Sequence, residues 1–447
     1  MAGNSIEDVV MVAQPIIGPP VALVKVGRFG PYTDALEYVT SPVRGIPFCS
    51  IRNRFHQLRY LSKLSAEFIK SIRFQIILDD ETPNARAWTQ DGRHYVGITT
   101  GLMLLIEYYF LNILSIRGVL TQFPENDKEE EVDVEKIREG FFLDKMLKTV
   151  EFNASPFRLP VRVPKSRLRR EIALGLATSA IEFVLWHEIG HCFHQHARIL
   201  NEVFEVQESA MAEWIPESEL CERQDARHLF ELQADSFAIF ALCAYALPDK
   251  KGVARKPDRI DDYAIWSLAI DSLFWIFSQK LPLDRVSPFH PHPQVRAWNK
   301  LQTIHILSKE QKFRTLKGTP LPAIKFVEAA ATLSSLWVDL ALPGNQWLWT
   351  HSENNDKVHS EWIALEERTA DLQKLQTEKY FDSQLFEEIM KHGGWPPALG
   401  PYSFNPPDPG AVPMNVGATS LAPRRIIKEE IQKIISRASR HKGSSNS

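Results

Sequence analysis

The chain has 447 residues, of which 44% are hydrophobic and 24% are charged, enough to bury a large core in roughly two or three structural units. Its formal net charge of −3 gives no overall basic field, so we expect no nucleic-acid partner. The four cysteines form neither a CxxC pair nor a disulfide framework, which indicates reduced thiols and a cytoplasmic protein.

The N-terminal part of the chain is predicted to contain a small sheet followed by a helix. Residues 1–50 carry scattered prolines and no basic leader, so we expect an irregular segment rather than a signal peptide. Apolar residues at helical spacing predict a helix over 51–71. Short stretches bounded by turns predict the strands of an antiparallel sheet: 73–78, 84–88 and 94–99. The apolar run 101–114 predicts the helix that follows.

The rest of the chain is predicted to be mainly helical, with prolines marking the breaks. Helices are expected at 134–150, 166–200, 225–247, 258–279 and 295–307, and in pieces through an extension at 311–393. The main domain is therefore expected at 51–310. The stretch 394–423 is rich in proline and predicts a linker, and 424–447 predicts a basic amphipathic helix and tail. We expect that helix to be solvated; a weak contact with acidic lipid is the alternative.

Neither of two long apolar runs predicts a membrane span, which needs about 20 predominantly apolar residues. Residues 101–116 are interrupted by Glu107 and Asn112, and residues 264–277 form a shorter run that contains Asp271. Both runs are therefore interpreted as buried helices, and we expect no membrane association.

The sequence His187-Glu188-Ile189-Gly190-His191 lies inside the predicted helix over 166–200. Residues four apart lie on one face of a helix, so both imidazoles can bind one metal ion. Glu188 follows the first histidine and can reach a water on that ion, as in the HExxH pattern of zinc peptidases. The alternative is a chance pair of helix histidines, so the other residues of a site must decide between the two.

A catalytic zinc ion needs a third protein ligand and an open position for water. The metzincin pattern is excluded, because its later positions hold His194 and Ala197 here. The alternative is a glutamate on the following helix, and Glu231 fits because its apolar neighbours indicate a buried carboxylate that needs a partner. Asp235 lies one turn further on the same face and is expected to accept the free N–H of a ligand histidine. His194 and His196 are interpreted as packing or surface residues.

The motifs HEIGH and ELQADSFA together resemble the gluzincin peptidases of the HtpX and CAAX-prenyl-endopeptidase type, whose second motif reads roughly ExxAD. Residues 83–102 resemble the family's NAFA turn, edge strand and helix start, and HPHPQVR at 290–296 resembles its HPPxxxR segment. Those branches are embedded in membranes by spans that this chain lacks. Arg86 also replaces the aromatic residue of NAFA.

The resemblance implies roles for residues outside the metal set. His290 would stabilise the oxyanion, with His292 as a competitor for that role, and Arg296 would hold nearby carboxylates. The strand 94–98 would offer a free edge to an extended peptide substrate. The substrate-binding residues implied in this way are Asn84, Tyr95, Val96 and Gly97.

The sequence therefore predicts an α+β protein, mainly α, with a zincin-like peptidase domain. We expect a zinc-dependent metalloendopeptidase acting on proteins or peptides, with Zn²⁺ held by His187, His191 and Glu231. Glu188 would act as general base. The alternatives are a highly specific protease activated by a cue, of the phage-exclusion or toxin-like kind, and a metal-stabilised binding scaffold without activity. The intact Glu188 argues against the scaffold, because a structural site needs no general base.

Overall fold

The structure, a computed structural model, describes residues 9–10, 22–24, 67–77 without 69, 83–117, 125–131, 162–204, 210–212, 224–245, 268–276 without 275, 290–303 without 293–294 and 301–302, and 352–380. The predicted helix over 134–150, the linker 394–423 and the basic helix 424–447 lie outside these residues, as do the predicted domain boundaries near residues 50 and 310.

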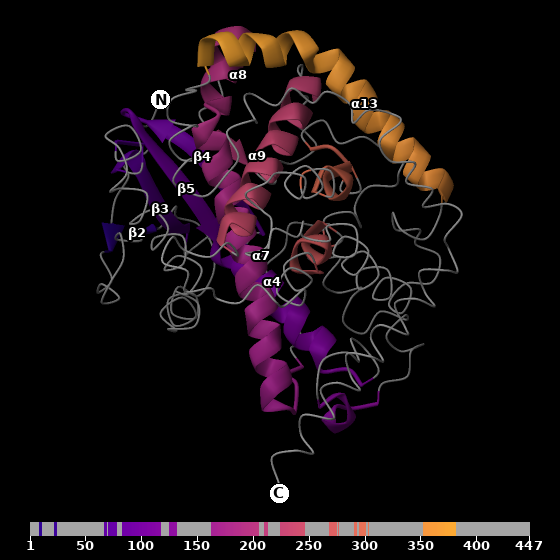
Figure 1. Cartoon of the computed structure of the whole chain (residues 1–447). Coiled ribbons are helices and arrows are strands. Elements are labelled where there is room, and N and C mark those ends of the chain that lie inside the picture. The colour runs from indigo at the N-terminus through magenta and orange to yellow at the C-terminus, as the bar shows by residue number, and fades with distance from the viewer. Residues whose placement is uncertain are drawn as a thin grey trace, which may run out of the picture.

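In the part of the chain that the structure describes, short strands form one mixed sheet in the order β1-β2-β3-β5-β4-β6 (Figure 1). The strands are β1 (Val9–Val10), β2 (Ala22–Val24), β3 (Ile72–Ile77), β4 (Ala85–Gln90), β5 (Arg93–Thr99) and β6 (Ala210–Ala212). The central strand β3 runs parallel to β2 and β5. The pairs β1–β2, β4–β5 and β4–β6 are antiparallel.

The order of the strands corrects the predicted antiparallel sheet. β4 and β5 form a hairpin through Asp91 and Gly92, which both have positive φ values (50° and 70°), as a tight two-residue turn requires. The hairpin places β5 between β3 and β4, so β5 is parallel to β3. The predicted free edge at 94–98 is therefore wrong, because the backbone of β5 is paired on both sides.

The described helices cover more of the chain than the strands do, so the fold is α+β and mainly helical, as expected. They are α4 (Thr100–Leu114), α7 (Arg167–Phe193), α8 (His196–Phe204), α9 (Gln224–Tyr245) and α13 (Ser352–Leu375), with a 3-10 turn η2 (Asn126–Lys128) and a π-helical turn η5 (Gln376–Tyr380). Residues 268–274 and 295–300 are also helical. Side chains cap two of the helices at their start: Thr99 Oγ1 accepts from Leu102 N, and Ser166 Oγ accepts from Arg169 N.

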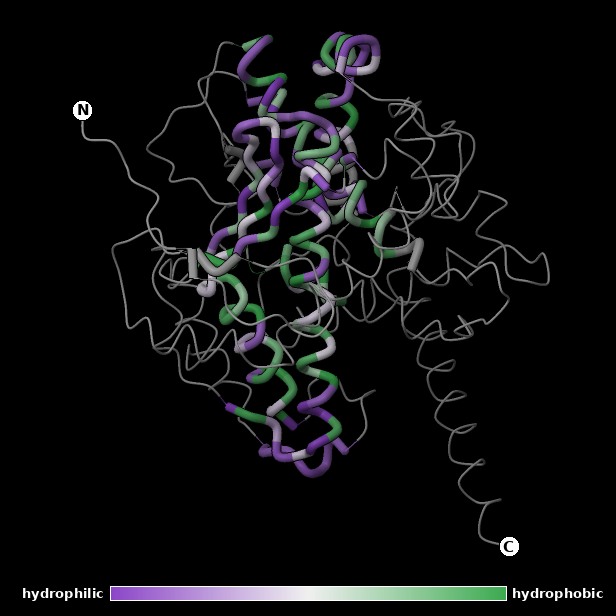
Figure 2. The backbone as a smooth tube through the Cα atoms, turned by 90° about the vertical axis from the view of Figure 1, so that its left-hand side faces the viewer, coloured by the Kyte–Doolittle hydropathy of each residue, from purple (hydrophilic) through white to green (hydrophobic). Residues whose placement is uncertain are grey.

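The helix α7 is the centre of the core, because it contacts α4, α9 and the strands β4 and β5. Figure 2 shows largely hydrophobic segments where the helices run past each other beside the sheet. Among the described helices, α7 is long and apolar enough to cross a membrane by length and composition, and 78% of its apolar window is buried inside the fold. Such burial is what the core helix of a folded domain shows.

A break after α7 was not predicted from the sequence, which indicated one helix over 166–200. The helix ends at Phe193, Gln195 takes a left-handed conformation (φ 54°), and α8 starts at His196. The N–H of His194 still bonds to Gly190 O at 2.9 Å, and the N–H of Gln195 bonds to Cys192 O at 3.2 Å. The helix is therefore interrupted at Gln195, shortly after the second histidine of the motif.

α7 contains two described glycines, and only Gly190 lies in close contact with α9. A Cβ atom at this position would lie 3.0 Å from Ala234 Cα, 3.2 Å from Ala234 O and 3.2 Å from Phe237 Cβ. The first two of these atoms are backbone, so the strain cannot be relieved by rotating a side chain. At Gly175, further along α7, a Cβ would meet nothing within 4 Å.

These two glycines provide a matched test of the helix contact. We expect Gly190→Ala to destabilise the metal-free chain by about 1–3 kcal/mol, because the added methyl group forces α9 away. Gly175→Ala should instead stabilise it by about 0.5–1 kcal/mol through higher helix propensity. Urea unfolding followed by circular dichroism measures both effects. Equal stabilisation by both changes would show that α7 and α9 are not in close contact at Gly190.

Candidate metal centre

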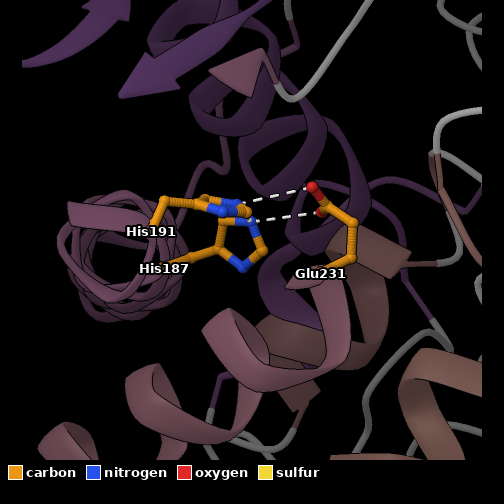
Figure 3. Close-up of side chains that lie close together, drawn as sticks. All are labelled: His187, His191 and Glu231. Carbon is orange, nitrogen blue, oxygen red and sulfur yellow. Dashed lines mark hydrogen bonds and ion pairs between the residues drawn. The ribbon is translucent and has the colours of Figure 1, made fainter. Parts of the chain in front are cut away.

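Two imidazoles on α7 face one carboxylate on α9 (Figure 3). His187 Nε2 lies 3.3 Å from Glu231 Oε2, and His191 Nε2 lies 3.4 Å from Glu231 Oε1. The two Nε2 atoms are 2.9 Å apart, and the three ligand atoms all lie within 4.8 Å of one another. Each of the three side chains is at most 3% exposed. The structure thus brings the three predicted ligands together in the core.

The arrangement fits a zinc ion. Zn–N and Zn–O bonds of about 2.0–2.1 Å in a tetrahedral site place neighbouring ligand atoms about 3.3 Å apart, close to the observed separations. Two imidazoles and one carboxylate are also a ligand set that zinc accepts in catalytic sites. A buried carboxylate needs a partner of opposite charge, and a cation held by all three side chains would supply it, which favours a metal ion over a purely structural cluster.

Asp235 holds His187 from the side opposite the cluster. Its Oδ1 lies 2.9 Å from His187 Nδ1, the contact that the sequence predicted. The Arg296 guanidinium donates to both carboxylate oxygens of Asp235, at 2.7 and 2.8 Å, and stacks 4.9 Å from the Phe274 ring. Burial raises the pKa of Asp235, but Arg296 and His187 outweigh burial, so the pKa lies below its ordinary value. Asp235 is therefore a charged acceptor that keeps Nε2 of His187 directed at the cluster.

His290 is the histidine of the 290–296 segment that the structure places against the site. Its Nδ1 lies 3.1 Å from Glu231 Oε2, and its side chain is 17% exposed. Arg296 also approaches Glu231, at 3.8 Å. Burial opposes ionisation of Glu231, yet His290 and the two facing histidines, His191 and His187, hold the pKa of Glu231 well below its ordinary value.

The other predicted site residues have backbone contacts that fix their places in the fold. The carbonyl of His292 accepts from the N–H groups of Val295 and Arg296, at 2.7 and 3.2 Å, so its backbone starts the helix at 295–300. Asn84 bonds through its backbone to Thr99 at the start of α4. Tyr95, Val96 and Gly97 lie in the interior strand β5. Their predicted contact with substrate cannot be made through a free strand edge, because β3 and β4 pair with that backbone.

His196 contacts the site, although the sequence indicated only a packing or surface residue. Its Nδ1 lies 2.8 Å from His191 Nδ1, on the side of the ring opposite Glu231. On a continuous helix, residues five apart point in different directions. The break at His194 and Gln195 turns the chain so that His196 meets His191. No glycine or proline marks this break, so the sequence carried no simple signal for it.

A cavity of about 360 Å³ adjoins His191 between β4 and α8. It is lined by Ala87, Trp88, Thr89, His94, His191, Cys192, Gln195, Ala197, Arg198, Asn201 and Glu202.

Glu188, the expected general base, is 1% exposed beside His187 on α7. Burial raises the pKa of the neighbouring Cys192 thiol, with a smaller contribution from Glu188, so this cysteine is an inert packing residue.

Residues 108–296 match the family model described as Peptidase U49, which covers less than half of the chain. The matched region contains His187, Glu188, His191, Glu231, Asp235 and His290, and it ends at Arg296. The match supports a peptidase, and with it protein or peptide substrates. Comparisons with curated proteins and with solved structures find no match. The closer resemblance to the HtpX and CAAX-prenyl-endopeptidase type stays a prediction.

Asp235→Asn tests the contact with His187. The amide can still accept from the imidazole but carries no charge, so we expect affinity for Zn²⁺ to fall about 10–100-fold. The control is Asp225→Asn on the same helix, since Asp225 also accepts two bonds from an arginine, Arg368, but is 45% exposed. That change should leave zinc affinity unaltered. Chelator competition measures both, and equal affinities for the two variants would contradict the role of Asp235.

Proposed function

We propose that the chain is a zinc-dependent metalloendopeptidase with a zincin-like active site of gluzincin type. The observation that carries the proposal is the convergence of His187, His191 and Glu231 at one buried point, inside the region that matches a peptidase family. Glu188 follows the first ligand directly, so the set holds both the ligands and a base.

The chemistry divides between the ion and the chain. When bound, zinc would supply a Lewis acid that polarises the scissile carbonyl and acidifies a water molecule. Glu188 would take the proton from that water and pass it to the leaving amine. Its place on α7 directly after His187, with 1% of the residue exposed, supports this role.

The surrounding residues would orient the ligands and the substrate carbonyl. Asp235, itself held by Arg296, would fix the tautomer of His187 so that Nε2 is the free ligand atom. His290, within 3.1 Å of Glu231, is placed where it could donate a proton or a hydrogen bond to charge that develops on the carbonyl oxygen. The substrates would be proteins or peptides, and the site of action the cytoplasm.

Metal analysis of purified protein is the first test. We expect about one zinc ion per chain, and strong loss of zinc in His187→Ala, His191→Ala and Glu231→Ala. Each change removes one donor from a set of three, so the loss should exceed that of any change outside the set. Full zinc occupancy in Glu231→Ala would place the third ligand elsewhere and remove the basis of the gluzincin assignment.

Glu188→Gln separates catalysis from metal binding. The amide keeps the shape of the side chain but cannot accept the proton, so turnover should fall by at least about a hundredfold while zinc content stays the same. New N-termini in a proteome incubated with wild-type or variant protein identify the cleaved substrates. A cleavage pattern that is identical for the two proteins would end the peptidase assignment, and the binding scaffold would take its place.

A further inference from the structure

A network of buried polar side chains runs from His191, the second proposed metal ligand, to α13 and η5 (Ser352–Tyr380), which together form the C-terminal segment of the described fold. His191 Nδ1 lies 2.8 Å from His196 Nδ1, and His196 Nε2 lies 3.0 Å from Gln233 Oε1. Gln233 and Gln376 then pair side by side, with Nε2 to Oε1 distances of 2.9 and 3.1 Å. His191, His196, Gln233 and Gln376 are all at most 4% exposed.

The chemistry of the groups fixes the direction of these hydrogen bonds. His191 uses Nε2 toward the ligand cluster, so its proton is on Nδ1. His196 must therefore accept at Nδ1 and carry its own proton on Nε2, which donates to Gln233 Oε1. That oxygen also accepts from Gln376 Nε2, while Gln233 Nε2 donates to Gln376 Oε1. Each polar atom in this network therefore has one consistent role, as a donor or as an acceptor.

Two rings lie nearly parallel to the ring of His196. The Phe230 ring stacks on it with centroids 4.3 Å apart and an interplanar angle of 11°, and the His194 ring lies 5.3 Å away at 10°. These parallel contacts, together with the contacts at both ring nitrogens, oppose rotation of the His196 ring. His196 is therefore a fixed acceptor rather than a mobile neighbour of His191.

We propose that His196 is a positioning residue for the metal centre. Gln376, on the C-terminal segment, in turn holds Gln233, the residue that bonds to His196. In this arrangement His196 sets the tautomer and ring plane of His191, as Asp235 does for His187. The proposal rests on the proposed function, because it takes His191 to be a zinc ligand. It adds that the metal centre depends on residue 376, which lies outside the matched region 108–296.

The contacts of the C-terminal segment support this dependence. α13 passes across the end of the fold near α8 and α9, and η5 continues it (Figure 1). Tyr380 packs in an apolar cluster with Ile199, Leu200 and Phe230, so η5 is docked on the two helices that carry His196 and Gln233. The Gln195 side chain donates to Tyr380 O at 3.0 Å, directly at the break between α7 and α8.

Zinc affinity of the full chain, measured by chelator competition, tests the role of His196. In His196→Asn the amide oxygen lies near the place of Nδ1 and can still accept from His191, so affinity should stay within about fivefold of wild type. In His196→Phe the ring volume and stacking remain but the acceptor is lost, so affinity should fall about 10–100-fold. The visible spectrum of the Co²⁺-loaded phenylalanine variant should also differ from wild type, because the ligand ring is no longer held in place.

Unfolding of the metal-free proteins separates positioning from packing. The phenylalanine variant keeps the volume of the ring, so it should be at least as stable as the asparagine variant without metal. Positioning thus predicts opposite orders for stability and for zinc affinity. The proposal would be overturned if the more stable of the two variants also bound zinc more tightly. It would also be overturned if His196→Phe bound zinc as tightly as wild type. Retention of zinc in His187→Ala would instead show that the proposed function itself is wrong.

Gln376→Leu tests the end of the hydrogen-bond network that is farthest from His191. Loss of its amide leaves Gln233 with one partner fewer, so zinc affinity should fall about 3–10-fold, less than for His196→Phe. The control is Gln373→Leu, one turn earlier on α13, because Gln373 bonds to Thr369 within its own helix. Zinc affinity of that variant should equal wild type. Equal affinities for the two leucine variants would remove the C-terminal segment from the proposal.

Discussion

The candidate centre depends on how closely α7 can approach α9. The ligands of one ion must come within about 3.3 Å of each other, and here they come from two different helices. Gly190 and Ala234 allow this approach, because the missing Cβ at Gly190 leaves room for the backbone of Ala234. The same contact places Glu231 and Asp235, which flank Ala234 on α9, against the two histidines that flank Gly190 on α7. Helix packing therefore sets the geometry of the site.

The charges buried at this contact explain why a cation suits it. Glu188, Glu231 and Asp235 are each at most 1% exposed, and Arg296 is a buried positive partner for Asp235. Three carboxylates thus face one guanidinium group at this contact, and uncompensated buried charge is costly. A divalent ion between His187, His191 and Glu231 would offset that excess. His290 lies nearest to the Glu231 carboxylate, with Nδ1 3.1 Å from Oε2.

The sequence indicated the cluster of His187, His191 and Glu231 because the signals of these residues are local. His187 and His191 are related by helical spacing, and Glu231 was indicated by its place in an apolar helix. The strands β3, β4 and β5 were also predicted within a residue or two. The sheet was predicted wrongly, because strand order is set by contacts between distant segments. A turn such as Asp91-Gly92 predicts a hairpin but not which strand lies beside it.

His196 and Gln376 could not be found in this way, and the reason is the break after α7. Gln195 has a left-handed backbone without being glycine, so its conformation must be held by its surroundings. One such contact is with Tyr380 O, at the end of the same segment that carries Gln376. The C-terminal segment thus supports the break, and the break brings His196 to His191. A boundary drawn near residue 310 would separate two parts of the chain that share one hydrogen-bond network.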